Sequence, residues 1–186
     1  SLRTRVSFQV GIDHLGGFSV FLGQQEVGLG NREPTSDVAK VLSGYVDCIV
    51  ARLSDHQLLS DLAKYASVPV VNALSDLEHP CQIMADLLTI YEHKDTLEGL
   101  SLAYIGDGNN VARSLCLAAP AVGMNFTSAS PEGYNLDEPS IREAQSRAAD
   151  PSIRIRTLTN PVEAVAGADV VYTDVWASMG QEAETS

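Results

Sequence analysis

The stretch that decides the fold reads Leu100-Ser101-Leu102-Ala103-Tyr104-Ile105-Gly106-Asp107-Gly108-Asn109-Asn110. Its first six residues form a short apolar run that predicts a fully buried strand, and a helix is predicted to begin at Val111. A buried strand that passes through a glycine-rich turn into a helix is typical of a parallel sheet covered by helices. This stretch therefore predicts an α/β fold.

The glycine spacing in this turn argues against a dinucleotide site. The dinucleotide fingerprint needs Gly or Ala at its third small position, and Val111 stands there. The turn does place Asn110 at the carboxyl end of a strand. Because its amide both donates and accepts hydrogen bonds, Asn110 is a candidate for binding a zwitterion.

Short apolar segments alternate with helical ones along the rest of the chain. Strands are predicted at residues 18–22, 48–51, 68–73, 100–105, 126–129, 153–158 and 169–174. Helices are predicted before Gly16-Gly17, at residues 35–45, 54–65 and 83–93, from residue 111, and at residues 140–149 and 162–166. This alternation predicts two Rossmann-like halves, each a mainly parallel sheet flanked by helices, divided into residues 1–80, a linking helix and connector at 81–98, and residues 99–186.

The start of the chain predicts an anion site. Residues Ser1 to Thr4 lie at the beginning of a predicted helix, where unpaired backbone N–H groups and the helix dipole attract phosphate. Arg3 and Arg5 can add forked hydrogen bonds to phosphate or carboxylate oxygens. The alternative is that both arginines are solvated surface charges.

Four further residues are candidates because of where they stand. Arg52 and Asp174 follow predicted strands, and the carboxyl ends of parallel strands are where open sheets bind ligands, although Arg52 could also be a charge that simply leaves the sheet. His79 and Gln82 are three residues apart across a first helical turn that Pro80 begins, so both can reach one ligand. The apolar stripe of that helix is predicted at Met84, Leu87, Leu88 and Tyr91. His79 and Cys81 share no helix face, so we expect no metal site.

Composition excludes several classes of protein. The 186 residues carry a formal charge of −12, which argues against binding nucleic acid, and no apolar run is long enough to span a bilayer. Three cysteines, Cys48, Cys81 and Cys116, fit buried free thiols in a reducing compartment better than a disulfide framework. We therefore expect a cytoplasmic protein that binds a small anion.

Four motifs in series carry a resemblance to a known family. They are Ser1-Leu2-Arg3-Thr4-Arg5, His79-Pro80-Cys81-Gln82, Gly106-Asp107-Gly108-Asn109-Asn110 and Asp174-Val175-Trp176-Ala177-Ser178-Met179-Gly180. Together they resemble the ornithine carbamoyltransferase family, within the aspartate/ornithine carbamoyltransferase superfamily. The Ser-Met-Gly loop after Asp174 is what points to ornithine.

The resemblance implies a role for each matching residue. Residues 1–80 would be a carbamoyl phosphate-binding domain and residues 99–186 an ornithine-binding domain. Ser1, Arg3 and Thr4 would bind the phosphate of carbamoyl phosphate, Arg52 and His79 its carbonyl oxygen and phosphate, and Gln82 its amide, with Arg3, Arg52 and His79 taking part in catalysis. Asn110, Asp174, Ser178 and Met179 would bind L-ornithine.

The resemblance also implies what the protein makes and how it assembles. The δ-amine of ornithine would attack the carbamoyl carbon to give citrulline and phosphate, as in arginine biosynthesis, with no metal and no cofactor. A homotrimer with shared sites is expected, with no nucleic acid and no membrane as partner.

The chain departs from the family at three places. Family members are longer at both ends, so we expect a fragment that is inactive alone, and the family's His-Cys-Leu-Pro segment and a further arginine would lie beyond Ser186. Gly28 stands where the family often has His or Gln. Alternative hypotheses are a carbamoyltransferase for another amine, such as putrescine or an acylated ornithine, and a non-catalytic relative that keeps the anion pocket.

Overall fold

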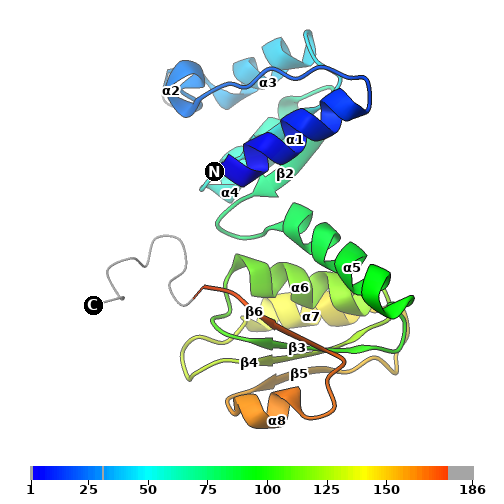
Figure 1. The fold of residues 1–186 in the computed structure, drawn as a ribbon. Coiled ribbons are helices and arrows are strands. Elements are labelled where there is room, and N and C mark those ends of the chain that lie inside the picture. The colour runs from blue at the N-terminus through cyan, green and yellow to red at the C-terminus, as the bar shows by residue number, and fades with distance from the viewer. Residues whose placement is uncertain (1, 31, 176–186) are drawn as a thin grey trace. The chain divides into compact units, whose positions relative to one another are not determined.

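The computed structural model describes residues 2–30 and 32–175. Contacts divide the chain into two compact units, Ser1–Ala73 and Leu74–Ser186. Figure 1 labels the helices and strands of both.

The first unit is built around a two-stranded sheet. Its elements are α1 (Leu2–His14), α2 (Gln24–Val27), α3 (Thr35–Ser43), β1 (Ile49–Arg52), α4 (His56–Tyr65) and β2 (Val70–Leu74), with β1 beside β2. Helix α4 begins where the Asp55 carboxylate accepts hydrogen bonds from two backbone N–H groups of its first turn. Ala39 of α3, Ile49 of β1 and Leu59 of α4 belong to the core of this unit.

The segment between α1 and α2 contradicts the prediction of a strand at residues 18–22. The structure has no strand there, and the side chains of Phe18 and Val20 are 86% and 60% exposed. A strand needs a partner for its backbone groups, and none of the described strands pairs with this segment. The predicted first helix is present as α1, but none of its residues is buried.

The second unit holds a larger sheet. Its elements are α5 (Pro80–Lys94), β3 (Ser101–Ile105), α6 (Asn110–Ala121), β4 (Asn125–Ala129), α7 (Glu138–Arg147), β5 (Ile155–Leu158), α8 (Pro161–Val165) and β6 (Val170–Thr173). The strand order is β5-β4-β3-β6, and all three pairings are parallel. The α/β class and the parallel sheet predicted from the sequence are confirmed.

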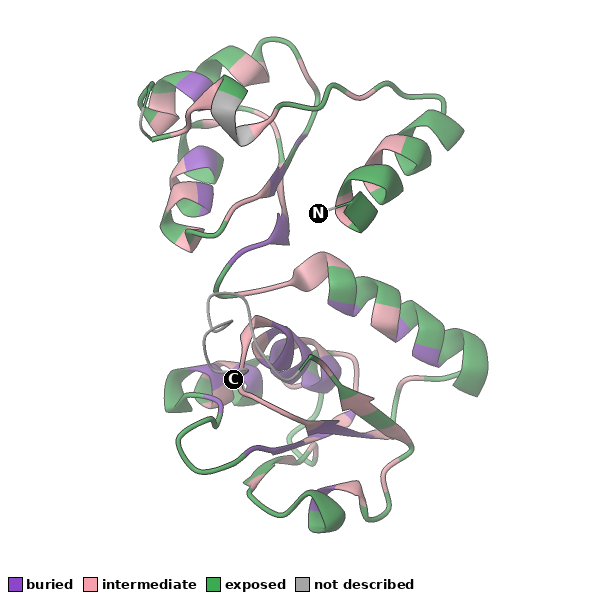
Figure 2. Ribbon diagram, turned by 60° about the vertical axis from the view of Figure 1, so that its left-hand side comes forward, coloured by how far each residue is buried: buried purple, intermediate pink, exposed green. Residues whose placement is uncertain are grey.

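Helices cover both faces of this sheet, with α6 and α7 on one side and α8 on the other (Figure 1). Tyr104, Leu115 and Phe126 are fully buried between the sheet and α6. Helix α5 is buried along one side only (Figure 2). The predicted stripe is wrong in part, because Ile83, Leu87 and Ile90 are the buried residues, whereas Met84, Leu88 and Tyr91 are 66%, 58% and 53% exposed.

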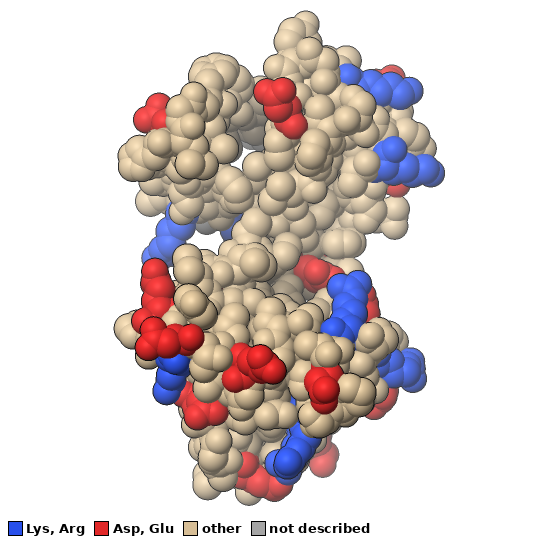
Figure 3. Space-filling view, turned by 90° about the vertical axis from the view of Figure 1, so that its right-hand side faces the viewer, with Lys and Arg blue, Asp and Glu red and all other residues tan. Residues whose placement is uncertain are grey.

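Charged side chains of both signs are interspersed on the face of the second unit that Figure 3 shows. The chain has 24 acidic and 12 basic residues, but the acidic side chains on this face do not form one continuous patch. None of the helices in the described ranges 2–30 and 32–175 is long and apolar enough to cross a membrane.

Candidate functional site

The first unit brings together two predicted phosphate ligands that are 48 residues apart in the sequence. Thr4 lies in the first turn of α1, and Arg52 is the last residue of β1. Arg52 Nη1 donates a hydrogen bond of 2.8 Å to Thr4 Oγ1. Burial lowers the pKa of the Arg52 guanidinium from its ordinary value. The end of β1 thus places a half-buried cation beside the N-terminal turn of α1.

The two arginines of α1 differ in their surroundings. Arg5 donates from Nε to Gln9 Oε1 at 3.1 Å, and its guanidinium carbon lies 3.9 Å from the centre of the Phe21 ring. These contacts are a side-chain hydrogen bond within α1 and a cation–π interaction. That either arginine binds an anion stays a prediction, and both are exposed, with Arg3 in the same first turn as Thr4.

In the second unit, helix α6 holds the loop that leads to His79. Asn110 Nδ2 donates to the backbone carbonyl of Ser75 at 2.7 Å, and the backbone N–H of His79 donates to Ser114 Oγ at 2.8 Å. Ser75 is completely buried, and Glu78 closes a turn with it through its own N–H. His79 therefore stands at a fixed point directly before Pro80 begins α5.

Arg113 fixes the same loop through charge. Its side chain is 14% exposed and pairs with Glu78 at 3.4 Å and with Glu143 of α7 at 2.9 Å. It also donates to Ser140 Oγ. An arginine with two carboxylate partners and little exposure is an anchor for the loop from Ser75 to His79.

Asp174 follows β6 and is held by a residue that sequence reasoning missed. Asn109 Nδ2 donates to Asp174 Oδ2 at 3.1 Å, and Asn109 Oδ1 accepts from the N–H groups of Val111 and Ala112, both at 3.0 Å. Asn109 is thus the N-cap of α6 and the partner of Asp174 at once. The sequence could have shown that Asn109 caps a helix, because it directly precedes one. No local pattern shows that Asn109 also contacts Asp174.

Two tyrosines of the adjacent strands β3 and β6, Tyr104 and Tyr172, lie near Asn109 and Asp174. The rings of Tyr104 and Tyr172 are stacked with their centres 6.0 Å apart, and Tyr104 Oη donates to the carbonyl of Asp107 at 2.9 Å. Burial, followed by the charges of Asp174 and Asp107, raises the pKa of Tyr104 above its ordinary value. Burial and then Asp86 do the same for Tyr172. Both phenols are therefore held as neutral hydrogen-bond donors.

The side chain of Gln82 also has a fixed partner. Gln82 Nε2 donates to Asp86 Oδ1 at 2.9 Å, one turn further along α5. Tyr172 Oη donates to the other oxygen of Asp86 at 3.0 Å. Neither Asp86 nor Tyr172 was among the predicted site residues, although the four-residue spacing of Gln82 and Asp86 was visible in the sequence.

The turn after β3 is closed by its own chain. Gly108 N–H donates to the carbonyl of Tyr134 at 2.7 Å, and a Cβ on Gly108 would lie 2.6 Å from backbone atoms of Asn135 and Leu136. Glycine is required here because a neighbouring backbone approaches so closely. The N–H is not left for a phosphate, in agreement with the sequence argument against a dinucleotide site.

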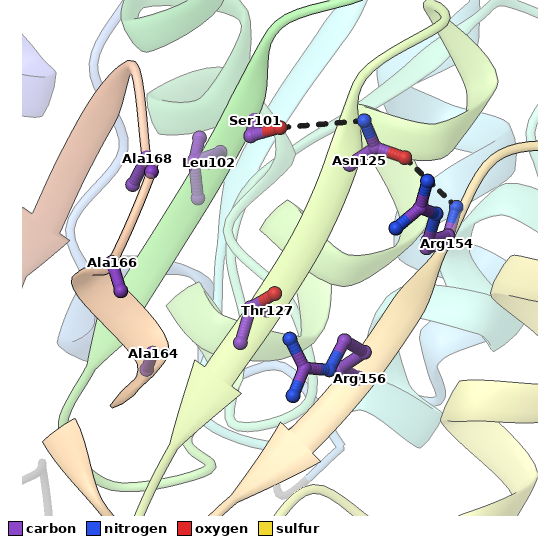
Figure 4. Close-up of a pocket in the computed structure, with 10 residues that line it drawn as sticks. Ser101, Leu102, Asn125, Thr127, Arg154, Arg156, Ala164, Ala166 and Ala168 are labelled. Atoms are coloured by element: carbon purple, nitrogen blue, oxygen red, sulfur yellow. Dashed lines mark hydrogen bonds between the residues drawn. The ribbon is translucent and has the colours of Figure 1, made fainter. Parts of the chain in front are cut away.

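A cavity of about 260 Å³ lies on the α8 side of the sheet of the second unit (Figure 4). Its lining residues are Ser101, Leu102, Asn125, Thr127, Arg154, Arg156, Ala164, Ala166, Gly167 and Ala168. None of the predicted site residues lines it. The cavity is therefore separate from the candidate residues at the strand ends.

Ser1, Ser178 and Met179 were predicted to bind substrate and lie outside the described residues. Within residues 2–30 and 32–175, no three His, Cys, Asp or Glu side chains are grouped so that they could hold a metal ion. All three cysteines are free thiols, but only Cys116 is buried, and Cys48 is exposed, contrary to the expectation of buried thiols.

The fold and these side chains define a class. It is an α/β protein with cationic, amide and carboxylate groups at the carboxyl ends of its strands, where open parallel sheets bind ligands. The family model described as "Aspartate/ornithine carbamoyltransferase, carbamoyl-P binding domain" matches residues 1–92, and the model "Aspartate/ornithine carbamoyltransferase, Asp/Orn binding domain" matches residues 98–186. The chain belongs to the aspartate/ornithine carbamoyltransferase family.

Individual relatives agree with this membership. An ornithine carbamoyltransferase of Pyrococcus abyssi is 54% identical over 184 residues, which are 99% of this chain and 58% of the relative. The solved ornithine carbamoyltransferase of Pyrococcus furiosus is 53% identical with a TM-score of 0.94, over 99% of this chain and 59% of that one. A solved mutant N-acetyl-L-ornithine transcarbamylase, complexed with PALAO, is 33% identical with a TM-score of 0.83, over 95% and 62%. The chain thus spans under two thirds of the length of these relatives.

The link between Asn109 and Asp174 predicts an unequal effect of two cap substitutions. Asn160 caps α8 through the N–H groups of Val162 and Glu163, so Asn160→Ala is a matched control for Asn109→Ala. Each should lower the free energy of unfolding by about 1 kcal/mol through the lost cap. Asn109→Ala should cost about 1 kcal/mol more, because Asp174 also loses its partner. Urea unfolding of the two variants measures this difference, and equal losses would contradict it.

Proposed function

We propose that the protein containing this chain transfers the carbamoyl group of carbamoyl phosphate to the δ-amine of L-ornithine, giving L-citrulline and phosphate. The observation that carries the proposal is the hydrogen bond from Arg52 to Thr4, which joins two predicted phosphate ligands at a helix N-terminus. The names of the relatives from Pyrococcus abyssi and Pyrococcus furiosus, both ornithine carbamoyltransferases, support ornithine as the acceptor.

The residues that bind carbamoyl phosphate, the donor of the carbamoyl group, take the following roles in this proposal. Ser1, Arg3 and Thr4 bind the phosphate, and Arg52 and His79 contact the carbonyl oxygen and the phosphate. Gln82 binds the carbamoyl amide. These assignments are supported by the half-buried guanidinium of Arg52 and by the fixed position of His79 before α5.

The residues proposed to bind ornithine, the acceptor of the carbamoyl group, include one at the start of α6 and one just after β6. Asn110 and Asp174 bind ornithine, together with Ser178 and Met179. Support comes from Asn109, which neighbours Asn110 in sequence and donates to Asp174 at 3.1 Å, so that an amide and a carboxylate lie at neighbouring strand ends. The division into residues 1–80, 81–98 and 99–186 stays a prediction.

The chemistry follows from where charge develops. An uncharged amine attacks the carbamoyl carbon and a tetrahedral oxyanion forms, then phosphate leaves with the bonding electron pair and takes the extra proton of the attacking nitrogen. Donors aimed at such an oxyanion are each typically worth roughly 3–4 kcal/mol. Because an alkylammonium has a pKa of about 10.4, the acceptor must lose a proton before it attacks. Holding both reactants in line supplies a further rate gain through proximity.

The assembly and location are part of the same proposal. By family resemblance we propose a homotrimer in the cytoplasm. Light scattering of the full-length protein should give three times the subunit mass, and a monomer mass would overturn this part.

Arg3→Ala should reduce the affinity for carbamoyl phosphate by at least tenfold, because a forked, charge-assisted hydrogen bond to phosphate is lost. The melting temperature should change little, because Arg3 is exposed. Calorimetric titration of the full-length protein measures the affinity. Arg5→Ala is the matched control, because Arg5 is bound to Gln9 and Phe21 and should leave the affinity unchanged. Unchanged binding by the Arg3 variant would remove Arg3 from the phosphate site.

The acceptor is tested by citrulline formation in the full-length protein with ornithine, acetylornithine, putrescine and aspartate compared. We expect turnover with ornithine alone. Preference for another amine would replace the acceptor but keep the reaction. Binding of carbamoyl phosphate without turnover of any acceptor would instead favour a non-catalytic relative.

A further inference from the structure

The amide of Gln82 is held in one orientation. A carboxylate only accepts hydrogen bonds, so the group that faces Asp86 must be the NH2 of the amide. The 2.9 Å bond from Gln82 Nε2 to Asp86 Oδ1 therefore leaves Gln82 Oε1 as the free end. That end is an acceptor, which is what the NH2 of a carbamoyl group requires.

Asp86 is itself held from a second element. Tyr172 donates to Oδ2 while Gln82 donates to Oδ1, so the two carboxylate oxygens have one donor each. Tyr172 belongs to β6 and stacks on Tyr104 of β3. The half-buried carboxylate is thus anchored to the sheet, and the exposed side chain of Gln82 is anchored to the carboxylate.

We propose that Asp86, supported by Tyr172, is a positioning residue that fixes the amide of Gln82 so that Oε1 accepts a hydrogen bond from the carbamoyl NH2. The inference rests on the proposed function and names what recognises the amino end of the donor substrate. Asp86 does not touch substrate. It acts by preventing the Gln82 amide from turning its NH2 toward the NH2 of the carbamoyl group, which would place two hydrogen-bond donors against each other.

An alternative explanation is that Gln82 and Asp86 only stabilise α5. Glutamine and aspartate four residues apart do so in isolated helices. The chain contains the matched case in α4, where Gln57 Nε2 donates to Asp61 Oδ1 at 3.2 Å. Asp61→Ala removes the same kind of pair from a helix that holds none of the proposed substrate residues, and is therefore the control for Asp86→Ala.

The test uses two donors that differ only in the group in question. Acetyl phosphate has a methyl group in place of the carbamoyl NH2 and has nothing to donate to Gln82. The dissociation constants of carbamoyl phosphate and acetyl phosphate are measured by calorimetry on the full-length protein. We divide the dissociation constant of acetyl phosphate by that of carbamoyl phosphate. This ratio reports recognition of the NH2 alone, because both donors make the same phosphate and carbonyl contacts, and it falls when recognition of the NH2 is lost.

We expect Asp86→Ala to weaken carbamoyl phosphate by about tenfold, the size of one hydrogen bond, and to leave acetyl phosphate unchanged. Asp86→Asn should restore most of the ratio, because its oxygen can still accept from Gln82 while its NH2 faces the hydroxyl oxygen of Tyr172. Asp61→Ala should change neither constant. In a Gln82→Ala background, Asp86→Ala should have no further effect on the ratio, because a residue that acts through another is not additive with it.

Equal weakening of both donors, an unchanged ratio, or additive effects of the Gln82 and Asp86 variants would overturn the positioning role. If Asp86→Ala does not fold, Tyr172→Phe serves instead, and the ratio should then fall by about threefold since one of two anchors of Asp86 is lost. An unchanged ratio in that variant would equally overturn the inference. Absence of carbamoyl phosphate binding or turnover in the unmodified protein would overturn the proposed function itself, so the two failures are distinguishable.

Discussion

Two adjacent asparagines at the start of α6 hold two separate segments of the second unit in place. Asn109 caps the helix and donates to Asp174 beyond β6, while Asn110 donates to the buried turn at Ser75. Cap residues of this kind usually satisfy only the helix. Here the same two side chains also fix the segment after a strand and the loop before His79. The positions of both segments depend on α6 beginning at this residue and not one later.

The fold could be predicted from the sequence where local pattern and tertiary environment agree. The buried run of β3 and the glycine turn after it specify a parallel strand followed by a helix, and both occur as predicted. The segment at residues 18–22 has the same apolar character but no described strand beside it, and it forms none. Helix α5 carries two apolar stripes with identical spacing, beginning at Ile83 and Met84, so periodicity could not tell which one is buried.

The candidate site was predictable by residue type and position, but not by side-chain direction. Arg52 and Asp174 were predicted because strand ends in parallel sheets carry ligand groups. Arg3 and Arg5 were both considered for an anion because both lie near the start of α1, and the sequence does not show that the guanidinium of Arg5 lies against the ring of Phe21. The pairs Asp86–Tyr172 and Asn109–Asp174 were missed because the two residues of each pair are more than 60 residues apart in the sequence. Local pattern holds no information on such pairs.

The turn after β3 shows why a motif that resembles a nucleotide fingerprint can serve another end. In a dinucleotide site the glycines leave backbone N–H groups free to approach phosphate. In this chain the N–H of Gly108 is bound to Tyr134, and its missing side chain makes room for the backbone at Asn135. The glycine therefore serves packing within the unit. What the turn presents instead is the pair of amide side chains that follow it, so its chemistry is that of Asn109 and Asn110 and not that of its backbone.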